Sequence, residues 1–297
     1  MDLRQLRHLI AIIEERSFSA AAKAVHLTQP ALTRSMNALE ASVGTPLLVR
    51  RNNGIEPTSA GSVLYEYANL LTATADNARA DIARLAKGLG GALNVGIGTH
   101  LADLALPKIL SEFARRYPHL SINLKIGMIE DLVPMVLEGR VELIASMVPT
   151  DRMQAGIAYE RLFTSTTQLY AAQRHHLRTI DDVITFEQLT RERWVYLNCL
   201  HADLDMNRFF ANGGMGFPDQ VFRTDSPRMM RAMIEDEGCL GIMPDDYMSG
   251  ARAQALRVEG MPVPRATGLL YRPDIPLRPI VMEFANLLRR ELSKPPG

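Results

Sequence analysis

The 297-residue sequence has little cysteine and no long hydrophobic run. Its two cysteines, Cys199 and Cys239, lie far apart, so they predict neither a disulfide framework nor a zinc-binding spacing. No stretch approaches the roughly 20 apolar residues of a membrane-spanning helix. The first residues, Met1–Arg4, lack the apolar core of a secretory signal. We therefore expect a reduced, cytoplasmic protein without membrane contact.

The sequence also lacks an excess of charge of either sign, with 33 basic and 33 acidic residues. Global charge is therefore no argument for or against nucleic acid as a partner. Residues 1–60 carry seven basic and five acidic residues, which is only a weak basic bias. The length predicts two or three domains with a large buried core.

Catalytic motifs are absent as well. Gly96 and Gly98 follow an expected strand, but Leu101 stands where a dinucleotide-binding loop has its third glycine. Neither a Gly-x-Ser-x-Gly motif, nor a phosphate-binding loop, nor a metal-ligand spacing occurs. We therefore expect no catalytic residue, no metal and no cofactor, and the sequence argues against an enzyme.

What is present begins with three short helical segments in the first 44 residues. Apolar residues at helical spacing predict a helix over residues 2–14. Ser17 is a good N-cap for a second helix that begins at Phe18. Thr28 is the expected N-cap of a third helix, and Gly44 is the expected end of that helix. This order predicts a helix-turn-helix, in which the third helix enters the DNA major groove.

The third helix has an apolar face and a polar face. Leu32, Met36 and Leu39 fall on the inner face with Ala31. Amide and guanidinium groups on the other face can bond base edges or phosphates. The DNA-binding residues expected on this helix are Gln29, Pro30, Thr33, Arg34 and Asn37. The alternative interpretation is a small helical bundle with a solvated polar face.

A hairpin is expected after this helix. Residues 47–51 and 55–58 are short extended runs, and Asn53-Gly54 between them is a strong turn signal. Such a hairpin beside a helix-turn-helix is a wing. Arg50 and Arg51 would then face phosphates or a minor groove.

These segments carry a family resemblance. The motifs are Phe18-Ser-x-Ala-Ala, residues 27–34 (Leu-Thr-Gln-Pro-Ala-Leu-Thr-Arg), Leu39-Glu40, Gly44-x-Pro-Leu47 and Thr58-x-Ala-Gly61. Together they resemble the winged helix-turn-helix of LysR-type transcriptional regulators. Leu48 and Pro57 depart from the family pattern, which usually has Phe and Leu at these positions. The resemblance implies sequence-specific binding to double-stranded promoter DNA.

A long helix is expected after the wing. Leu64, Ala68, Leu71, Ala75, Ala78, Ile82 and Leu85 form a heptad seam. We expect a homodimer through residues 59–87, because a regulator with half-site symmetry needs two DNA-reading heads. The resemblance implies the same dimer and a homotetramer built from it. The alternative is a helix packed on its own domain. Gly88–Gly91 is the expected hinge.

The remaining two thirds alternate strands and helices. Strands are expected at 93–98, 120–126, 141–146, 168–172, 194–197, 221–224, 240–243 and 268–271. Helices are expected at 104–117, 131–138, 203–211, 227–236 and 279–292. This order predicts mostly parallel, doubly wound sheets in a two-lobed α/β domain.

The resemblance extends to this region through four shorter motifs. They are Leu106-Pro107, Arg116-Tyr-Pro118, Gly139-x-Val-Glu-Leu-Ile144 and Gly238-x-x-Gly-Ile-x-Pro244, with Glu142 where the family usually has Asp. They imply a fold like that of periplasmic binding proteins. The expected domains are a winged helix-turn-helix at 1–58, a linker helix and hinge at 59–90, and an effector-binding domain at 91–297. Its lobe 1 would take 91–163 and 267–297, and its lobe 2 would take 164–266.

A small-molecule effector is expected between the lobes, because ligands of such sheets lie at the carboxyl ends of strands. The candidate effector-binding residues are Thr99, His100, Ser146, Met147, Asn198 and Ser226. His100 and Thr99 are also plausible helix caps, and Ser146 is a plausible small core residue. Because these strand ends carry no cluster of cations, an acidic effector is not specifically supported.

Two other classes deserve comparison. A solute-binding protein fits the carboxy-terminal fold, but it explains neither the helix-turn-helix nor the lack of a secretory signal. A peroxide sensor of the same family would use a cysteine pair in lobe 2. The separation of Cys199 and Cys239 favours inert thiols instead.

Overall fold

The computed structural model describes residues 1–51, 54–85, 91–104, 106–148, 155–180, 182–216, 218 and 220–292. The chain forms two compact units, which are described here one at a time. The first unit contains Met1–Ala92, His119–Ser121 and Pro134–Val141, and the second contains the rest. The boundaries expected for the DNA-binding domain, the linker and the two lobes stay predictions.

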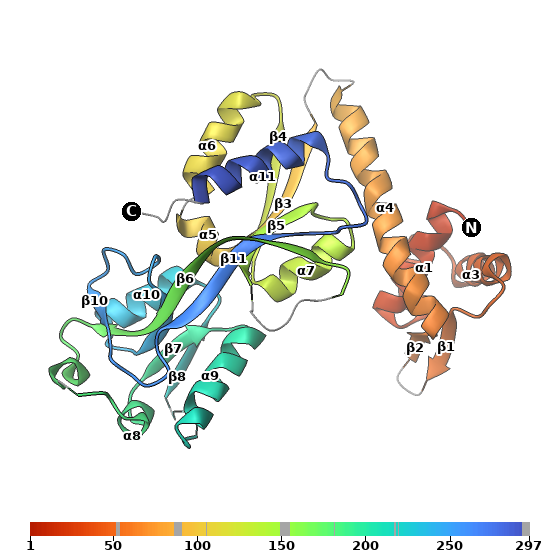
Figure 1. Ribbon diagram of the computed structural model, residues 1–297. Helices are drawn as coiled ribbons and strands as arrows, with labels where there is room; N and C mark the ends of the chain where they lie inside the picture. The colour runs from red at the N-terminus through yellow and green to blue at the C-terminus, as the bar shows by residue number, and fades with distance from the viewer. Residues whose placement is uncertain are drawn as a thin grey trace. The chain divides into compact units, whose positions relative to one another are not determined.

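The first unit begins with three helices and a hairpin (Figure 1). They are α1 (Leu3–Glu15), α2 (Phe18–Ala24), α3 (Gln29–Val43), β1 (Leu48–Arg51) and β2 (Gly54–Pro57). The Ser17 side chain caps α2 as expected, and Gly44 ends α3 with a φ of 79° in the left-handed region. Leu9, Ile12, Leu32 and Leu39 are fully buried and hold the three helices together. The expected helix-turn-helix and wing are therefore confirmed.

The long helix α4 (Ser59–Leu85) packs along α1. Ala68 is fully buried, Leu64 packs on the core of the three helices, and Arg7 pairs with Asp76 at 2.6 Å. The first two positions of the expected heptad seam, Leu64 and Ala68, therefore pack in the core of the unit itself and are not available to a second helix. Leu71, Ala78 and Ile82 are exposed, and the side chain of Leu85 lies outside the described residues. The expected hinge at 88–91 also lies outside them, except for Gly91.

A seven-stranded sheet forms the centre of the second unit. Its strands are β3 (Ala92–Gly98), β4 (Ser121–Gly127), β5 (Leu143–Val148), β6 (Ala158–Ala172), β9 (Gly241–Pro244), β10 (Ala253–Ala255) and β11 (Val263–Tyr271). Neighbouring strands follow the order β10-β6-β11-β5-β3-β4, and β9 also pairs with β6. The β3–β5 pair is parallel, whereas β11 runs antiparallel to both β5 and β6. The expectation of mostly parallel sheets was therefore wrong at this point, and the sheet is mixed.

Two strands are longer than the sequence predicts. β6 begins ten residues before the expected start at 168, and β11 begins at Val263 rather than at 268. Both expected lobe boundaries, near 163 and 266, consequently fall inside continuous strands. The two strands pair with each other over nearly the whole of β11, with a bulge between Thr267 and Gly268. The two expected lobes of this unit are thus connected by β6 and β11, which are continuous strands.

A smaller sheet contains β7 (Trp194–Leu197) and β8 (Val221–Thr224), which are parallel. Helices α9 (Leu200–Asn212) and α10 (Pro227–Asp236) belong to the same region (Figure 1). Trp194 is fully buried, its indole N–H donates to the carbonyl of Leu189 at 2.8 Å, and its ring packs edge-on against Phe210. Burial of such aromatic rings is a major source of core stability. This core fixes the ends of β7 and β9 at the cavity described below.

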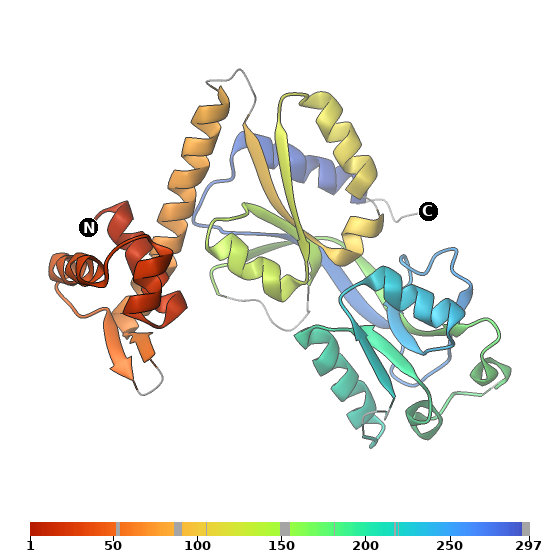
Figure 2. The ribbon, with the colours of Figure 1, turned by 180° about the vertical axis from the view of Figure 1, so that it is seen from behind.

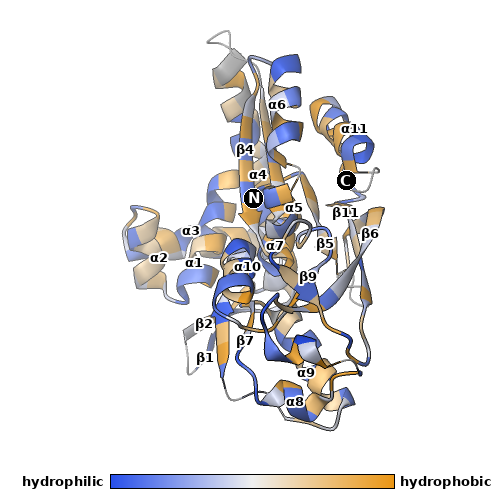
Figure 3. Cartoon of the chain, turned by 90° about the vertical axis from the view of Figure 1, so that its left-hand side faces the viewer, coloured by the Kyte–Doolittle hydropathy of each residue, from blue (hydrophilic) through white to orange (hydrophobic). Residues whose placement is uncertain are grey.

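The other helices are α5 (Thr99–Leu104), α6 (Leu106–Arg116), α7 (Ile129–Leu137), α8 (Phe186–Thr190) and α11 (Pro279–Leu292), with a 3₁₀ turn, η1 (His176–Thr179). All belong to the second unit except the last turn of α7, from Pro134 on, which belongs to the first. One helix was expected over 104–117, but the structure has α5 and α6 in its place, and residue 105 is outside the described part. Phe113 of α6 and Phe284 of α11 pack edge-on at 5.1 Å, on the yellow and dark blue helices of Figure 2. α11 carries a hydrophobic and a hydrophilic face (Figure 3). Among the described residues, no helix is long and apolar enough to cross a membrane.

Candidate DNA-binding surface and effector cavity

The face of α3 opposite the core presents the expected DNA-binding side chains. Gln29, Pro30, Arg34 and Asn37 are exposed. Thr33 is half-buried, and its hydroxyl donates to the carbonyl of Gln29 at 3.0 Å. The Thr33 hydroxyl is thus already engaged with its own helix. The amides of Gln29 and Asn37 and the guanidinium of Arg34 have the chemistry for base edges or phosphates.

The wing is tied to α3 through one carboxylate that the sequence analysis did not single out for this role. Oε1 of Glu40 accepts from the backbone N–H of Leu47 at 2.7 Å and from that of Leu48 at 3.2 Å. The chain therefore enters β1 at a position fixed by α3. Arg50 and Arg51 are exposed on β1, and Arg51 lies 4.0 Å from Glu56 of β2. An exposed pair at that distance is weak, so both arginines remain available to phosphates.

The second unit holds a cavity of about 610 Å³, a volume typical of small-molecule sites. Thr99 and His100 reach it from the end of β3, and Ser146 and Met147 reach it from β5. The structure thus brings four of the six expected effector-binding residues together. Their shared edge of the sheet follows from the parallel β3–β5 pair, as the ends of parallel strands meet.

The other two expected residues do not line the cavity. Ser226 is exposed, and its hydroxyl caps α10 by accepting from the N–H of Met229 at 3.3 Å. Asn198 is also exposed, and its backbone N–H donates to the carbonyl of Thr224. Their neighbours Pro227 and Cys199 line the cavity instead. The placement was wrong because the loops after β7 and β8 turn these two side chains outward.

His100 is engaged in a network at the edge of the cavity. Its Nε2 lies 3.1 Å from Oδ2 of Asp246, and both side chains are about one-tenth exposed. The neighbouring Tyr247 donates its hydroxyl to Asp103 at 2.5 Å. Burial, followed by the bond to Asp103, raises the pKa of Tyr247 above its ordinary value. Both bonds join α5 to the segment after β9.

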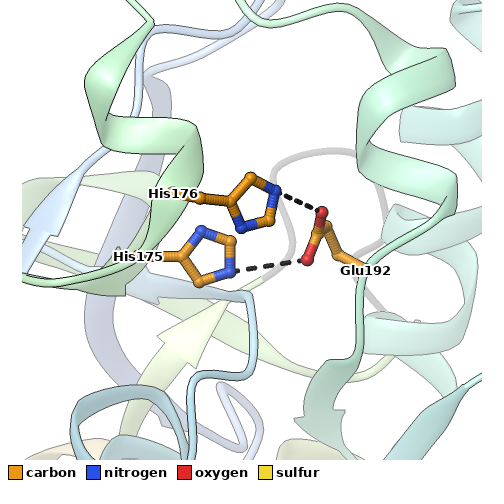
Figure 4. Close-up of side chains that lie close together, drawn as sticks. All are labelled: His175, His176 and Glu192. Atoms are coloured by element: carbon orange, nitrogen blue, oxygen red, sulfur yellow. Dashed lines mark ion pairs between the residues drawn. The ribbon is translucent and has the colours of Figure 1, made fainter.

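Three side chains elsewhere in the second unit form a cluster that could in principle hold a metal ion: His175, His176 and Glu192 (Figure 4). Nε2 of His175 lies 3.5 Å from Glu192, and Nε2 of His176 lies 3.0 Å from it. However, the backbone N–H of Leu177 donates to Nδ1 of His175 at 3.3 Å. Nδ1 is therefore unprotonated, and the neutral ring carries its proton on Nε2, where a metal would need a lone pair. Burial also lowers the pKa of His175, so this arrangement favours a hydrogen-bonded cluster over a metal site.

Comparison with known proteins finds two family models that match this chain. The family model for the LysR substrate binding domain matches residues 86–293, and the model for the bacterial regulatory helix-turn-helix protein of the lysR family matches residues 3–62. The chain belongs to the LysR family of transcriptional regulators. It is accordingly a DNA-binding transcriptional regulator with a carboxy-terminal effector-binding domain.

Individual relatives of this LysR-family chain are regulators as well. The HTH-type transcriptional regulator BudR of Raoultella terrigena is 28% identical over 223 residues, covering 70% of this chain and 76% of BudR. The hydrogen peroxide-inducible genes activator of Dickeya chrysanthemi is 25% identical over 301 residues, covering 99% of this chain and 96% of that protein. The crystal structure of full-length CbnR with its target DNA has a TM-score of 0.60 at 23% identity, covering 98% of this chain and all of CbnR, and shows a shared fold.

In this chain, the sequence did not reveal those site residues whose role depends on neighbours that are distant in the sequence. Glu40 belongs to a family-like dipeptide, which was the only signal for its importance. Thr167, Asp205 and Arg265 also line the cavity, although no motif marks them. They lie in the second half of the domain, where strand lengths were underestimated.

Proposed function

We propose that this LysR-family regulator reads promoter DNA with Gln29, Pro30, Thr33, Arg34 and Asn37 of α3, and clamps the phosphates with Arg50 and Arg51. The exposure of Arg34 and Asn37 on the helix face opposite the buried Leu32 and Leu39 carries this proposal. Arg34 is the residue best suited to a bidentate bond with a guanine edge. Thr33 contributes through its methyl group, since its hydroxyl is bonded to Gln29.

The reading unit of this proposal is a homodimer through residues 59–87. Val63, Tyr67, Leu71 and Ile82 of α4 are 56%, 56%, 42% and 66% exposed. Together with the exposed Ala78 they share one face of the helix. Apolar side chains of this size on one helical stripe favour a second helix as the partner. A homotetramer would pair two such dimers on one promoter.

Effector control is the second part of the proposal. A small molecule in the 610 Å³ cavity, touching Thr99, His100, Ser146 and Met147, would favour one arrangement of the domain over another. In a dimer, such a population shift changes the spacing of the two reading helices and the bend of the DNA. Regulation rather than catalysis is the proposed activity, and the cytoplasm is the proposed location.

Arg34→Ala tests base reading. An operator would first be selected from random DNA with the unaltered protein, and affinity would then be measured on single-base variants by fluorescence anisotropy. If Arg34 reads a base, discrimination falls by about 1–3 kcal/mol at one position. Arg50→Ala should weaken binding to all variants alike and lower the salt dependence, as expected for a phosphate contact.

Arg4→Ala is the matched control, because Arg4 is an exposed arginine of α1, outside α3 and the wing. It should change neither affinity nor preference. Unchanged affinity and unchanged base preference in Arg34→Ala would refute the proposed role of Arg34.

A further inference from the structure

The wall of the effector cavity is unusually rich in methionine. Met128, Met147, Met206, Met243 and Met261 line it, with Phe209 and Ile242 among the other apolar side chains. Methionine is unbranched and polarisable, so it adapts to apolar ligands of different outline. The interior of this cavity is thus suited to a ligand with a large apolar surface.

The charged groups of the wall are paired or lie at the exposed edge. The Arg265 guanidinium of β11 donates to the carboxylate of Asp205 on α9. His100 is paired with Asp246, as described above. Arg208 and Glu259 are exposed, so water solvates their charges. The half-buried Glu130 also lines the cavity, and it already takes part in an interaction of its own. A ligand with a net charge would therefore lose its own hydration without gaining a dedicated partner of opposite charge.

One hydroxyl in the wall is buried and has no hydrogen-bond partner in the described part of the chain. Thr167 of β6 lines the cavity and is 6% exposed, and its Oγ1 makes no hydrogen bond within the described part of the chain. A buried polar atom left in this way is unfavourable. The flanking residues Thr166 and Gln168 face the other side of β6, where both donate to Asp245. Thr167 is thus the one of the three whose polar side-chain group is left for a ligand.

We propose that the effector is an uncharged, largely apolar small molecule that carries an uncharged hydrogen-bonding substituent on its apolar body, and that the Thr167 hydroxyl pairs with this substituent. The inference depends on the proposed effector role of the cavity. Oγ1 of Thr167 is itself buried in this structure, so the pairing requires rotation of the side chain about its first torsion, which breaks no hydrogen bond among the described residues. Thr167 is then a specificity-determining residue of the effector site.

Indole-3-acetamide, indole-3-acetate and tryptamine form a matched set of probes, because they share one ring system and differ in charge. Binding to the full-length protein would be measured by isothermal titration calorimetry. The neutral amide should bind about tenfold more tightly than either ion, the factor expected for one hydrogen bond gained without loss of a charge's hydration. Tighter binding of the acetate or of tryptamine overturns the proposed class, and so does failure of the whole set to bind.

Thr167→Val tests the hydroxyl, and Thr267→Val is its control. Thr267 is also a fully buried threonine whose hydroxyl has no partner among the described residues, but it does not line the cavity. Both variants should unfold at the same temperature as the unaltered protein or higher, because an unpaired buried hydroxyl is removed from each. Thr167→Val should weaken the amide about tenfold and leave plain indole within twofold, since indole has no side-chain amide to pair with the hydroxyl. Thr267→Val should leave both unchanged.

The role of Thr167 would be overturned if Thr167→Val weakened the binding of the amide and of indole equally, or weakened neither. Operator binding measured on the same samples separates the two proposals. Intact operator binding with failed probe binding removes the ligand class alone, whereas loss of operator binding by the unaltered protein removes the regulatory function itself.

Discussion

Oε1 of Glu40 on α3 lies 2.7 Å from the backbone nitrogen of Leu47, where the chain turns into the wing. The same oxygen also accepts from Leu48. One side chain of the reading helix therefore sets where β1 begins, and with it where Arg50 and Arg51 stand. The side chains proposed to read bases and those proposed to bind phosphates are in this way positioned by one element.

Glu40→Ala should uncouple the wing from α3. Two backbone N–H groups lose their acceptor, which should cost about 1–3 kcal/mol of stability and lower operator affinity. Urea unfolding and anisotropy would measure the two effects. Glu40→Gln keeps a carbonyl oxygen at the same position and should retain most of both quantities. Equal damage from the two substitutions would contradict this account.

Gly61→Ala should disrupt the start of α4. A Cβ at this position would lie 1.9 Å from the carbonyl oxygen of Leu47, which is far inside the contact distance and involves backbone. We expect a loss above about 2 kcal/mol of stability, because the overlap forces the start of the wing to move. Gly216→Ala is the control, as a Cβ added there would meet nothing within 4 Å among the described residues. Circular dichroism melting of both variants decides the matter, and similar melting temperatures would argue against the crowding.

The helix-turn-helix should lose stability in mild acid because of His8. This side chain is buried on α1 with Nδ1 2.7 Å from the Ser35 hydroxyl, and burial lowers its pKa below the ordinary 6.5. The unfolded chain then binds a proton more readily, so stability falls as the pH drops below 6.5 toward the folded-state value. Arg4 acts in the same direction and Asp2 in the opposite one.

His8→Gln should weaken this pH dependence without abolishing it, because burial also lowers the pKa of His175. His26→Gln is the control at an exposed histidine. Urea unfolding of the full-length protein between pH 5 and pH 8 provides the measurement. Identical slopes in the unaltered protein and in His8→Gln would show that another group is responsible.

The two thiols should differ in reactivity. Cys239 is fully buried, and burial raises the pKa of its thiol, so the reactive thiolate is scarce. Cys199 is partly exposed and lines the cavity. Iodoacetamide should therefore modify Cys199 first and Cys239 only on unfolding, as read by mass spectrometry of the native protein over time. Peroxide treatment followed by the same mapping tests the redox alternative, which requires a bond between the two sulfurs.

Glu192→Ala should destabilise the second unit through His175 rather than through His176. His175 has a 6% exposed side chain, so water cannot replace the carboxylate 3.5 Å from its Nε2, and the loss should cost about 1–3 kcal/mol. The His176 side chain is 68% exposed, so water replaces its partner and His176→Ala should cost under about 0.5 kcal/mol. Urea unfolding of the two variants compares them directly. A larger loss of stability in His176→Ala than in Glu192→Ala would contradict the importance given to His175.

Local sequence determined the elements that close over a few residues. The caps at Ser17 and Gly44, the Asn53-Gly54 turn signal and the apolar stripe of Leu32 and Leu39 each act between near neighbours, so the helix-turn-helix and wing were predictable. The strand β7 and the helices α10 and α11 were predicted to the residue for the same reason.

Tertiary structure decided the rest. β6 and β11 are long because each pairs with the other across most of its length, and such pairing leaves no local pattern. The same antiparallel pairing makes the sheet mixed. It also brings Thr167 of β6 and Arg265 of β11 to the cavity that Thr99 lines from the end of β3. Asn198 and Ser226 point outward because their loops turn at positions that the strand ends alone do not specify. The sequence by itself therefore determined that this protein binds DNA, whereas the packing of distant strands decided what its cavity can hold.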